Sequence, residues 1–269
     1  MCGLPRQSSR PRGDTVEDAA GCWVFPGFID GHTHMQCWTG MDWTADSFET
    51  GTRAAACGGT TTIVDYATAD RGVTMPDALA EWHRRADGTC TANYAFHMAL
   101  AEWNERNRAD LSAMREAGVS SFKTYFAYDH LRLDDAETLE VLEELKRVGG
   151  ILCVHCENGT LVNELQKRVF EQGIHGPRPC AQPSGCVRAE AVSRLLYLAH
   201  LAGDAPVNVV HLSTKLGLEH SRCQRAAEEH LCRDLPSVSD ARRYLLSGAG
   251  RGRLCGRQVC DEPAAAPCG

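Results

Sequence analysis

Apolar runs rich in β-branched residues alternate with helical patterns from residue 23 to about residue 230. "ILCVHCE" is typical of a short buried strand, and "DDAETLEVLEELKRVGG" is typical of a helix with acids at its start and bases near its end. About six such strand–helix pairs follow one another. Strands separated by helices pair in parallel through right-handed crossovers. The alternation therefore predicts an α/β fold, either a TIM-type barrel or an open doubly wound sheet.

The same patterns predict the positions of the elements. We expect strands over 22–34, 60–67, 92–100, 119–128, 151–157 and 206–213. We expect helices over 46–59, 76–87, 108–118, 134–150, 158–173, 188–203 and 214–230. A loop rich in Pro, Gly and Cys is expected over 176–187.

Charge and hydropathy exclude several classes of protein. The 269 residues include 35 acids and 28 bases, for a net charge of −7, which argues against nucleic acid or an anionic membrane as a main partner. No apolar run reaches the roughly 18 residues of a membrane span, and the polar start "MCGLPRQSSRPRGD" lacks a signal core. We therefore expect a cytoplasmic protein whose fourteen cysteines are mostly free thiols.

Histidines occur at or near the ends of three expected strands. His32 and His34 are two residues apart in "PGFIDGHTH", so in a strand both side chains point to one face. His155 and His211 come late in "ILCVHCE" and "VNVVHLS". In a parallel barrel the carboxyl ends of all strands meet at one rim, and imidazole is a common zinc ligand. Four histidines from three strands predict a metal site there, which a lone HxH pair does not.

Lys123 lies inside the apolar, aromatic strand "VSSFKTYFAY". Burying an ammonium group is costly, so the ordinary expectation is a lysine that reaches water or pairs with an acid. The other possibility is a buried amine with a depressed pKa, which reacts with carbon dioxide to give a carbamate. A carbamate is a carboxylate on a long arm and is able to bridge two metal ions.

Several long motifs now indicate a family. "PGFIDGHTH", "FETGTRAAACGGTTTIVDYA", "SFKTYFAY", "GGILCVHCENG" and "APVNVVHLSTKLGLE" resemble, in order and spacing, the dihydropyrimidinase and D-hydantoinase branch of the cyclic amidohydrolases. The resemblance runs from about residue 14 to residue 225. It implies a metal-dependent TIM barrel with a small β-sandwich built from both ends of the chain.

The resemblance also implies roles for residues. His32 and His34 would hold one zinc ion, His155 and His211 the other, and carbamylated Lys123 would bridge the two. Tyr128 matches the family tyrosine that hydrogen-bonds the substrate carbonyl and the developing oxyanion, so Lys123 and Tyr128 are the expected catalytic residues. The substrate would be a small cyclic ureide, a dihydropyrimidine or a 5-substituted hydantoin, opened to an N-carbamoyl amino acid. The family is typically tetrameric.

Both ends of the chain depart from the family pattern. We expect residues 1–22 to be an atypical remnant of the β-sandwich, 23–230 a partial barrel of about six of the eight βα units, and 231–269 a disordered, non-family tail. The family's catalytic aspartate, carried by the last barrel strand, has no match. These features suggest a truncated, frameshifted reading of a longer gene, and a chain that by itself is poorly soluble or metal-poor with little hydrolase activity.

Two other interpretations stay open. One is a non-catalytic scaffold like the dihydropyrimidinase-related proteins, which keep the fold and lose the metals. The other is an allantoinase-like or dihydroorotase-like amidohydrolase with similar ligands. Metal analysis separates the first from an enzyme, and a substrate panel separates the second.

Overall fold

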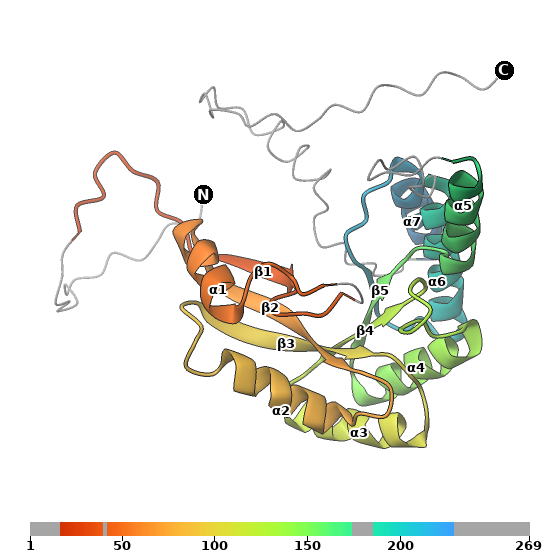
Figure 1. The fold of residues 1–269 in the computed structure, drawn as a ribbon, viewed down its shortest axis with the longest axis horizontal. Coiled ribbons are helices and arrows are strands. Elements are labelled where there is room, and N and C mark those ends of the chain that lie inside the picture. The colour runs from red at the N-terminus through yellow and green to blue at the C-terminus, as the bar shows by residue number, and fades with distance from the viewer. Residues whose placement is uncertain (1–16, 40–41, 174–184, 229–269) are drawn as a thin grey trace. The chain divides into compact units, whose positions relative to one another are not determined.

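The computed structural model describes residues 17–39, 42–173 and 185–228 (Figure 1). It divides into two compact units, each described here by itself. Of the described residues, those within 17–67 and 78–97 form the first unit, and those within 68–77 and 98–228 form the second. The expected loop over 176–187 lies largely outside the described residues, as does the expected tail over 231–269.

The strands form one parallel sheet in chain order, β1-β2-β3-β4-β5-β6. The strands are β1 Phe28–Thr33, β2 Thr60–Ala69, β3 Asn93–Leu100, β4 Ser121–Tyr125, β5 Ile151–His155 and β6 Val207–Val209. The helices are α1 Phe48–Cys57, α2 Met75–Ala86, α3 Glu105–Glu116, α4 Asp135–Val148, α5 Gly159–Glu171, α6 Gly185–Leu201 and α7 Lys215–Glu228. Sequential parallel order with alternating helices is the arrangement of an incomplete TIM barrel, which confirms the first of the two expected folds and excludes the doubly wound sheet.

Capping residues set the limits of the best-defined helices. Asp134 caps α4 by accepting from the Glu137 backbone N–H, while the Glu137 side chain accepts from the Asp134 backbone N–H. This capping box satisfies two donors that a helix start leaves unpaired. Gly149 ends the helix with φ of 77°, a left-handed conformation that glycine adopts without steric cost.

In the first unit, aromatic side chains fill the space between α1 and the sheet. Phe48 of α1 is fully buried and meets Phe96 of β3 edge to face, with ring centroids 6.1 Å apart. Ile63 and Tyr66 of β2 are buried beside them in the same unit. Asp65 of β2 is also fully buried, away from water.

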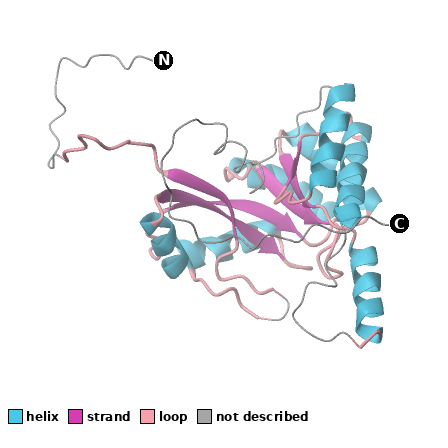
Figure 2. Cartoon of the chain, turned by 90° about the horizontal axis from the view of Figure 1, so that it is seen from above, coloured by secondary structure: helices cyan, strands magenta, loops and turns pink. Residues whose placement is uncertain are grey.

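In the second unit, β4, β5 and β6 form the centre of the core. Lys123 of β4 lies opposite Cys153 of β5, and Cys153 lies opposite Asn208 of β6. Helix α6 buries a long apolar side and packs against α7 (Figure 1). Figure 2 shows the helices in cyan and the strands in magenta. This register brings Lys123 and His155 onto adjacent strands, because Tyr125 of β4 pairs with His155.

Several boundaries differ from those expected: α3 begins at Glu105 rather than residue 108 and β6 ends at Val209 rather than residue 213, and β1, β4 and α6 differ as well. Strand β1 begins at Phe28 rather than residue 22, and the preceding Trp23 and Phe25 are 88% and 68% exposed, stacked on each other. Pro26 interrupts the run because it has no N–H to donate to a sheet. Strand β4 covers 121–125 instead of 119–128, and α6 begins at Gly185, three residues before residue 188.

Among helices in the described part of the chain, none combines the length and apolarity needed to cross a bilayer.

Candidate metal centre

His32 and His34 lie in a cluster of rings in the first unit, which we call the β1 histidine cluster (His32, His34, Tyr66 and His97). The two imidazoles meet edge to face, with centroids 5.1 Å apart. The Tyr66 ring stacks on His34 at 5.0 Å and on His97 at 4.6 Å. Its hydroxyl lies 3.1 Å from Nδ1 of His32. The HxH pair is therefore held by aromatic neighbours rather than standing in solvent.

Asp65 fixes the loop that carries this pair. Its carboxylate accepts from the Thr33 hydroxyl at 2.8 Å and from the Met35 backbone N–H at 2.7 Å, so it binds the chain on both sides of His34. Burial raises the pKa of Asp65 from 3.8 to about 6, and the hydrogen bonds only partly offset that rise. Asp65, which lies inside β2, therefore supports the loop after β1.

The second unit holds the other predicted residues, which we call the Lys123 cluster (Lys123, Tyr128, His155 and His211, with Glu157). Lys123 is 1% exposed. Burial lowers the pKa of its amine from 10.5 to about 7. A large share of Lys123 is then neutral near pH 7, which is the form that reacts with carbon dioxide. The alternative, a lysine reaching water, is excluded.

His155 and His211 face one another across β5 and the end of β6. Nδ1 of His155 and Nε2 of His211 are 3.0 Å apart. Burial lowers the pKa of both imidazoles, that of His211 to about 3, with the Lys123 charge as a further cause. Both are therefore neutral near pH 7, the form in which imidazole binds metals.

Glu157 holds His155 from the far side of the ring. Its carboxylate lies 3.1 Å from Nε2 of His155 and 3.1 Å from the Arg188 guanidinium. The hydrogen bond with His155 is the first cause that keeps the pKa of Glu157 below its usual value. An Nε2–H donated to this carboxylate leaves the Nδ1 lone pair pointing at His211, and carboxylate support of this kind accompanies most metal-binding histidines. Nε2 of His211, 3.0 Å away, can donate a proton to that lone pair or share a metal ion with it.

Tyr128 lies next to the histidine pair on the loop after β4. Its ring centroid is 5.0 Å from that of His155, and the side chain is 48% exposed. Tyr128 has φ of 66° and His211 has φ of 40°, both in the left-handed region. Non-glycine residues there carry a cost of roughly 1–2 kcal/mol each, and such strain gathers at functional sites.

The chemistry of these donors fits metal ions. Nitrogen ligands at 2.0–2.1 Å from a tetrahedral ion lie roughly 3.3 Å apart, close to the separation of the His155 and His211 nitrogens. Within the described residues no set of three His, Cys, Asp or Glu side chains is close enough to hold an ion. Lys123, the expected bridging ligand, is not one of these four residue types. The other expected ligands are divided between two clusters that lie in different units. Their meeting in one centre stays a prediction.

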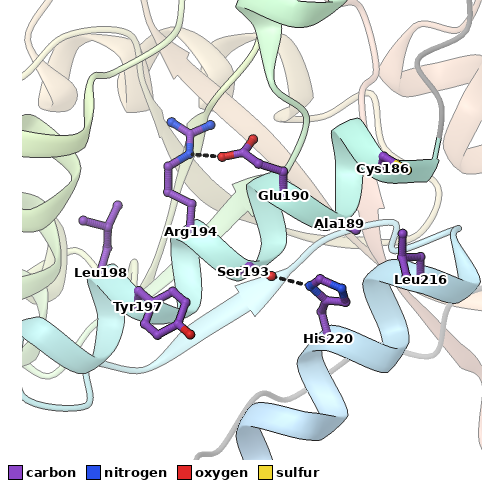
Figure 3. Close-up of a pocket in the computed structure, with 9 residues that line it drawn as sticks. All are labelled: Cys186, Ala189, Glu190, Ser193, Arg194, Tyr197, Leu198, Leu216 and His220. Atoms are coloured by element: carbon purple, nitrogen blue, oxygen red, sulfur yellow. Dashed lines mark hydrogen bonds and ion pairs between the residues drawn. The ribbon is translucent and has the colours of Figure 1, made fainter.

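A groove lies elsewhere on the second unit, between α6 and α7. It has a volume of about 600 Å³ and is lined mainly by apolar atoms, with the Ser193 hydroxyl 2.5 Å from Nδ1 of His220 (Figure 3). Glu190 and Arg194 form an ion pair at its edge, 3.1 Å apart. No predicted site residue lines it. Ser193 and His220 join two helices, and the groove adds nothing to the metal chemistry.

Sequence reasoning missed three supporting residues: Tyr66, Asp65 and Glu157. Glu157 lies two residues after His155, inside a quoted motif, and that spacing was a usable signal. Tyr66 and Asp65 are adjacent on β2, and nothing in their local sequence indicates contact with a loop more than 30 residues earlier. His97 is a fourth supporting residue: its ring stacks on Tyr66, and its Nε2–H donates to the Gly31 carbonyl, 3.1 Å away.

Comparisons with known proteins agree with this picture. The model of the amidohydrolase family matches residues 23–177. A D-hydantoinase of Streptomyces coelicolor is 40% identical over 202 residues, covering 74% of this chain and 43% of the relative. The structure of a D-hydantoinase from a Bacillus species, AR9, has a TM-score of 0.75 at 36% identity, covering 78% of this chain and 47% of the other. That of a dihydropyrimidinase from Brevibacillus agri has a TM-score of 0.72 at 34% identity, covering 75% and 44%. The chain thus spans about half the length of the curated relatives it matches.

Proposed function

This chain belongs to the amidohydrolase family, in its hydantoinase and dihydropyrimidinase branch, and on that premise we propose that it carries the metal-binding part of a cyclic-amide hydrolase. The observation that supports this most is the Lys123 cluster. A buried amine with a pKa of about 7 lies on the strand next to that of His155, whose imidazole is supported by the Glu157 carboxylate and faces the imidazole of His211. A purely structural core gains nothing from burying these groups, since each costs free energy that an apolar side chain does not.

We propose two zinc ions as the cofactor. His155 and His211 would hold one and His32 and His34 the other. Lys123 would bridge them as a carbamate, formed when its neutral nitrogen adds to carbon dioxide and releases one proton. When bound, a pair of metal ions supplies activated water near neutral pH and polarises a carbonyl.

Residues of the chain would then orient the substrate. Tyr128 is half exposed beside His155, so its hydroxyl is available to donate a hydrogen bond to a ring carbonyl. Burial raises the pKa of Tyr128, which keeps the hydroxyl protonated at neutral pH. As negative charge develops on the carbonyl oxygen, that bond strengthens, and losing one such donor typically costs about 10²–10³ in rate.

The proposed substrates are hydantoins and dihydropyrimidines, by analogy with the relatives' names. Cleavage of the ring C–N bond by water gives an N-carbamoyl amino acid, with the proton passing to the leaving nitrogen. A homotetramer in the cytoplasm is the corresponding prediction for assembly and location. An allantoinase-like or dihydroorotase-like specificity is the nearest alternative.

The test is metal analysis of the purified full chain, grown with zinc and bicarbonate. We expect bound zinc, and we expect its loss in K123A and in H155A. A folded chain that takes up no zinc would contradict the proposal and favour the metal-free scaffold interpretation.

A substrate panel completes the test. Hydantoin, dihydrouracil, allantoin and dihydroorotate are each incubated with the zinc-loaded chain. Whatever ring opening occurs is expected on the first two and is expected to disappear in K123A. Ring opening that survives K123A would show that the reaction does not depend on this centre.

A further inference from the structure

The β1 histidine cluster contains two residues to which the family resemblance gives no role, Tyr66 and His97, and the Tyr66 ring contacts the other three rings. Tyr66 is 1% exposed, on β2, and its ring stacks on that of His34 and on that of His97. The interplanar angles are 21° with His34 and 29° with His97, so the Tyr66 ring is nearly parallel to each of them. His97 is itself anchored by its 3.1 Å hydrogen bond to the Gly31 carbonyl, beside His32.

The Tyr66 hydroxyl reaches the other histidine of the pair. Its oxygen lies 3.1 Å from Nδ1 of His32. A phenol hydroxyl is both donor and acceptor, so this contact suits either tautomer of His32. The tautomer matters for metal binding: a neutral imidazole binds through its unprotonated nitrogen, and the bond made by the other nitrogen decides which one that is.

We propose that Tyr66 is a positioning residue that prepares His32 and His34 for a metal ion. Its oxygen accepts the Nδ1–H of His32, which places the proton on Nδ1 and assigns coordination to Nε2. Its ring, held against His97, fixes the plane of His34. One side chain thereby sets the tautomer of one ligand and the orientation of the other.

The two clusters would then be supported differently. The imidazole of His155 has a charged carboxylate, Glu157, as its hydrogen-bond partner, whereas that of His32 has a neutral hydroxyl. A carboxylate strengthens the ligand more than a hydroxyl does, because the charge favours the polarised imidazole. The ion held by His32 and His34 is accordingly expected to be the weaker bound of the two.

This inference rests on the proposed metal site, so its test separates the two. The full chain and Y66F are stripped of metal and titrated with cobalt(II), whose visible absorption reports ligand geometry without any turnover. Y66F keeps the ring stack and removes only the hydroxyl. Y94F is the matched control: it lies in the same unit, on β3, and loses a hydroxyl bond to Asp87 away from both ligands.

The expected result is a loss of about 10- to 100-fold in affinity for the weaker cobalt ion in Y66F, with the tighter ion and Y94F unchanged. If each cobalt ion binds Y66F with the same affinity as it binds the unaltered chain, the inference is overturned and the proposed function is unaffected. An unaltered chain that binds no cobalt would overturn both.

Nitrogen-15 spectra of the imidazoles give a second readout, independent of affinity and of any destabilisation. In the zinc-loaded chain His32 is expected to show a protonated Nδ1 in slow exchange with water. In Y66F that proton is expected to exchange faster, because its acceptor is gone. A His32 protonated on Nε2 in the loaded chain would contradict the assignment.

Discussion

The two clusters hold their histidines by different means. In the β1 histidine cluster, ring stacking and a neutral hydroxyl orient the imidazoles, and a buried carboxylate, Asp65, ties down the loop. In the Lys123 cluster, ionic groups orient the imidazole: the Glu157 carboxylate contacts His155, and the Arg188 guanidinium contacts Glu157. A hydrogen bond sets a tautomer in each cluster, and stacking fixes ring planes at little electrostatic cost, but only the charged carboxylate also raises ligand basicity. The difference predicts one loosely and one firmly held ion.

The largest effect is expected from replacing Lys123 with methionine. K123M removes the proposed bridge, and we expect zinc binding to fall by more than about 10²-fold, beyond the loss seen for supporting residues. The metal-free chain should become more stable by a few kcal/mol, because each unit of pKa depression reflects about 1.4 kcal/mol of cost in burying the charged amine.

Zinc content and urea unfolding of the same preparations measure both effects. K167M, the loss of a lysine that is 68% exposed, is the control and should change neither. A K123M chain that keeps its zinc would remove Lys123 from the site.

The next effect concerns the ionic support of His155. E157A is expected to weaken the tighter ion by about 10- to 100-fold and to leave the weaker ion unchanged. Cobalt titration measures both. H220A removes a histidine of the same unit whose Nδ1 pairs with the Ser193 hydroxyl, and it should alter neither ion. If E157A weakens both ions equally, the two clusters are not supported independently.

Removing Asp65 tests the first unit in the same way. D65A leaves the Met35 N–H and the Thr33 hydroxyl without their buried acceptor, at a cost of about 2–4 kcal/mol in unfolding free energy. D65N keeps one acceptor oxygen and should lose less. Chemical denaturation measures both variants, and equal losses would mean that Asp65 contributes through its charge rather than through these bonds.

The smallest effect is a dependence of stability on pH. The pKa of Asp65 is raised from 3.8 to about 6 in the folded chain, with burial as the main cause. Between those values the folded state binds more protons than the unfolded state, so this group lowers the unfolding free energy as pH rises from about 4 to about 6. D65N should remove this decrease, because an amide does not titrate in this range. Unfolding free energies of the unaltered chain and of D65N, measured between about pH 4 and about pH 6, test this. If both free energies change with pH at the same rate, the raised pKa of Asp65 is contradicted.

Much of the fold was predictable because each element has a local signal. Helix α4 shows its capping box, its terminal glycine and its charge asymmetry in sequence, and it lies within two residues of both expected limits. The expected range of strand β1 was too long. An apolar run does not show that Trp23 and Phe25 lie before the first residue that pairs with β2. Tyr128 was expected inside a strand, but the chain turns first, with positive φ.

The site was predictable to a different degree. The HxH pair, Lys123 and the late histidines could be named, because ligands carry side chains of recognisable chemistry. Asp65 and Tyr66 could not, because their partners are brought together only by the parallel pairing of β1 and β2. The expected low solubility and low activity of the chain stay predictions, as does the union of the two clusters.

X-ray absorption of the zinc-loaded chain tests that union most directly. The account predicts about two imidazoles per zinc and a zinc–zinc scattering path at roughly 3.5–4 Å, with that path lost in both H34A and K123A. Zinc that shows no metal neighbour at that distance, or that keeps it in H34A, would contradict a single centre built from both clusters.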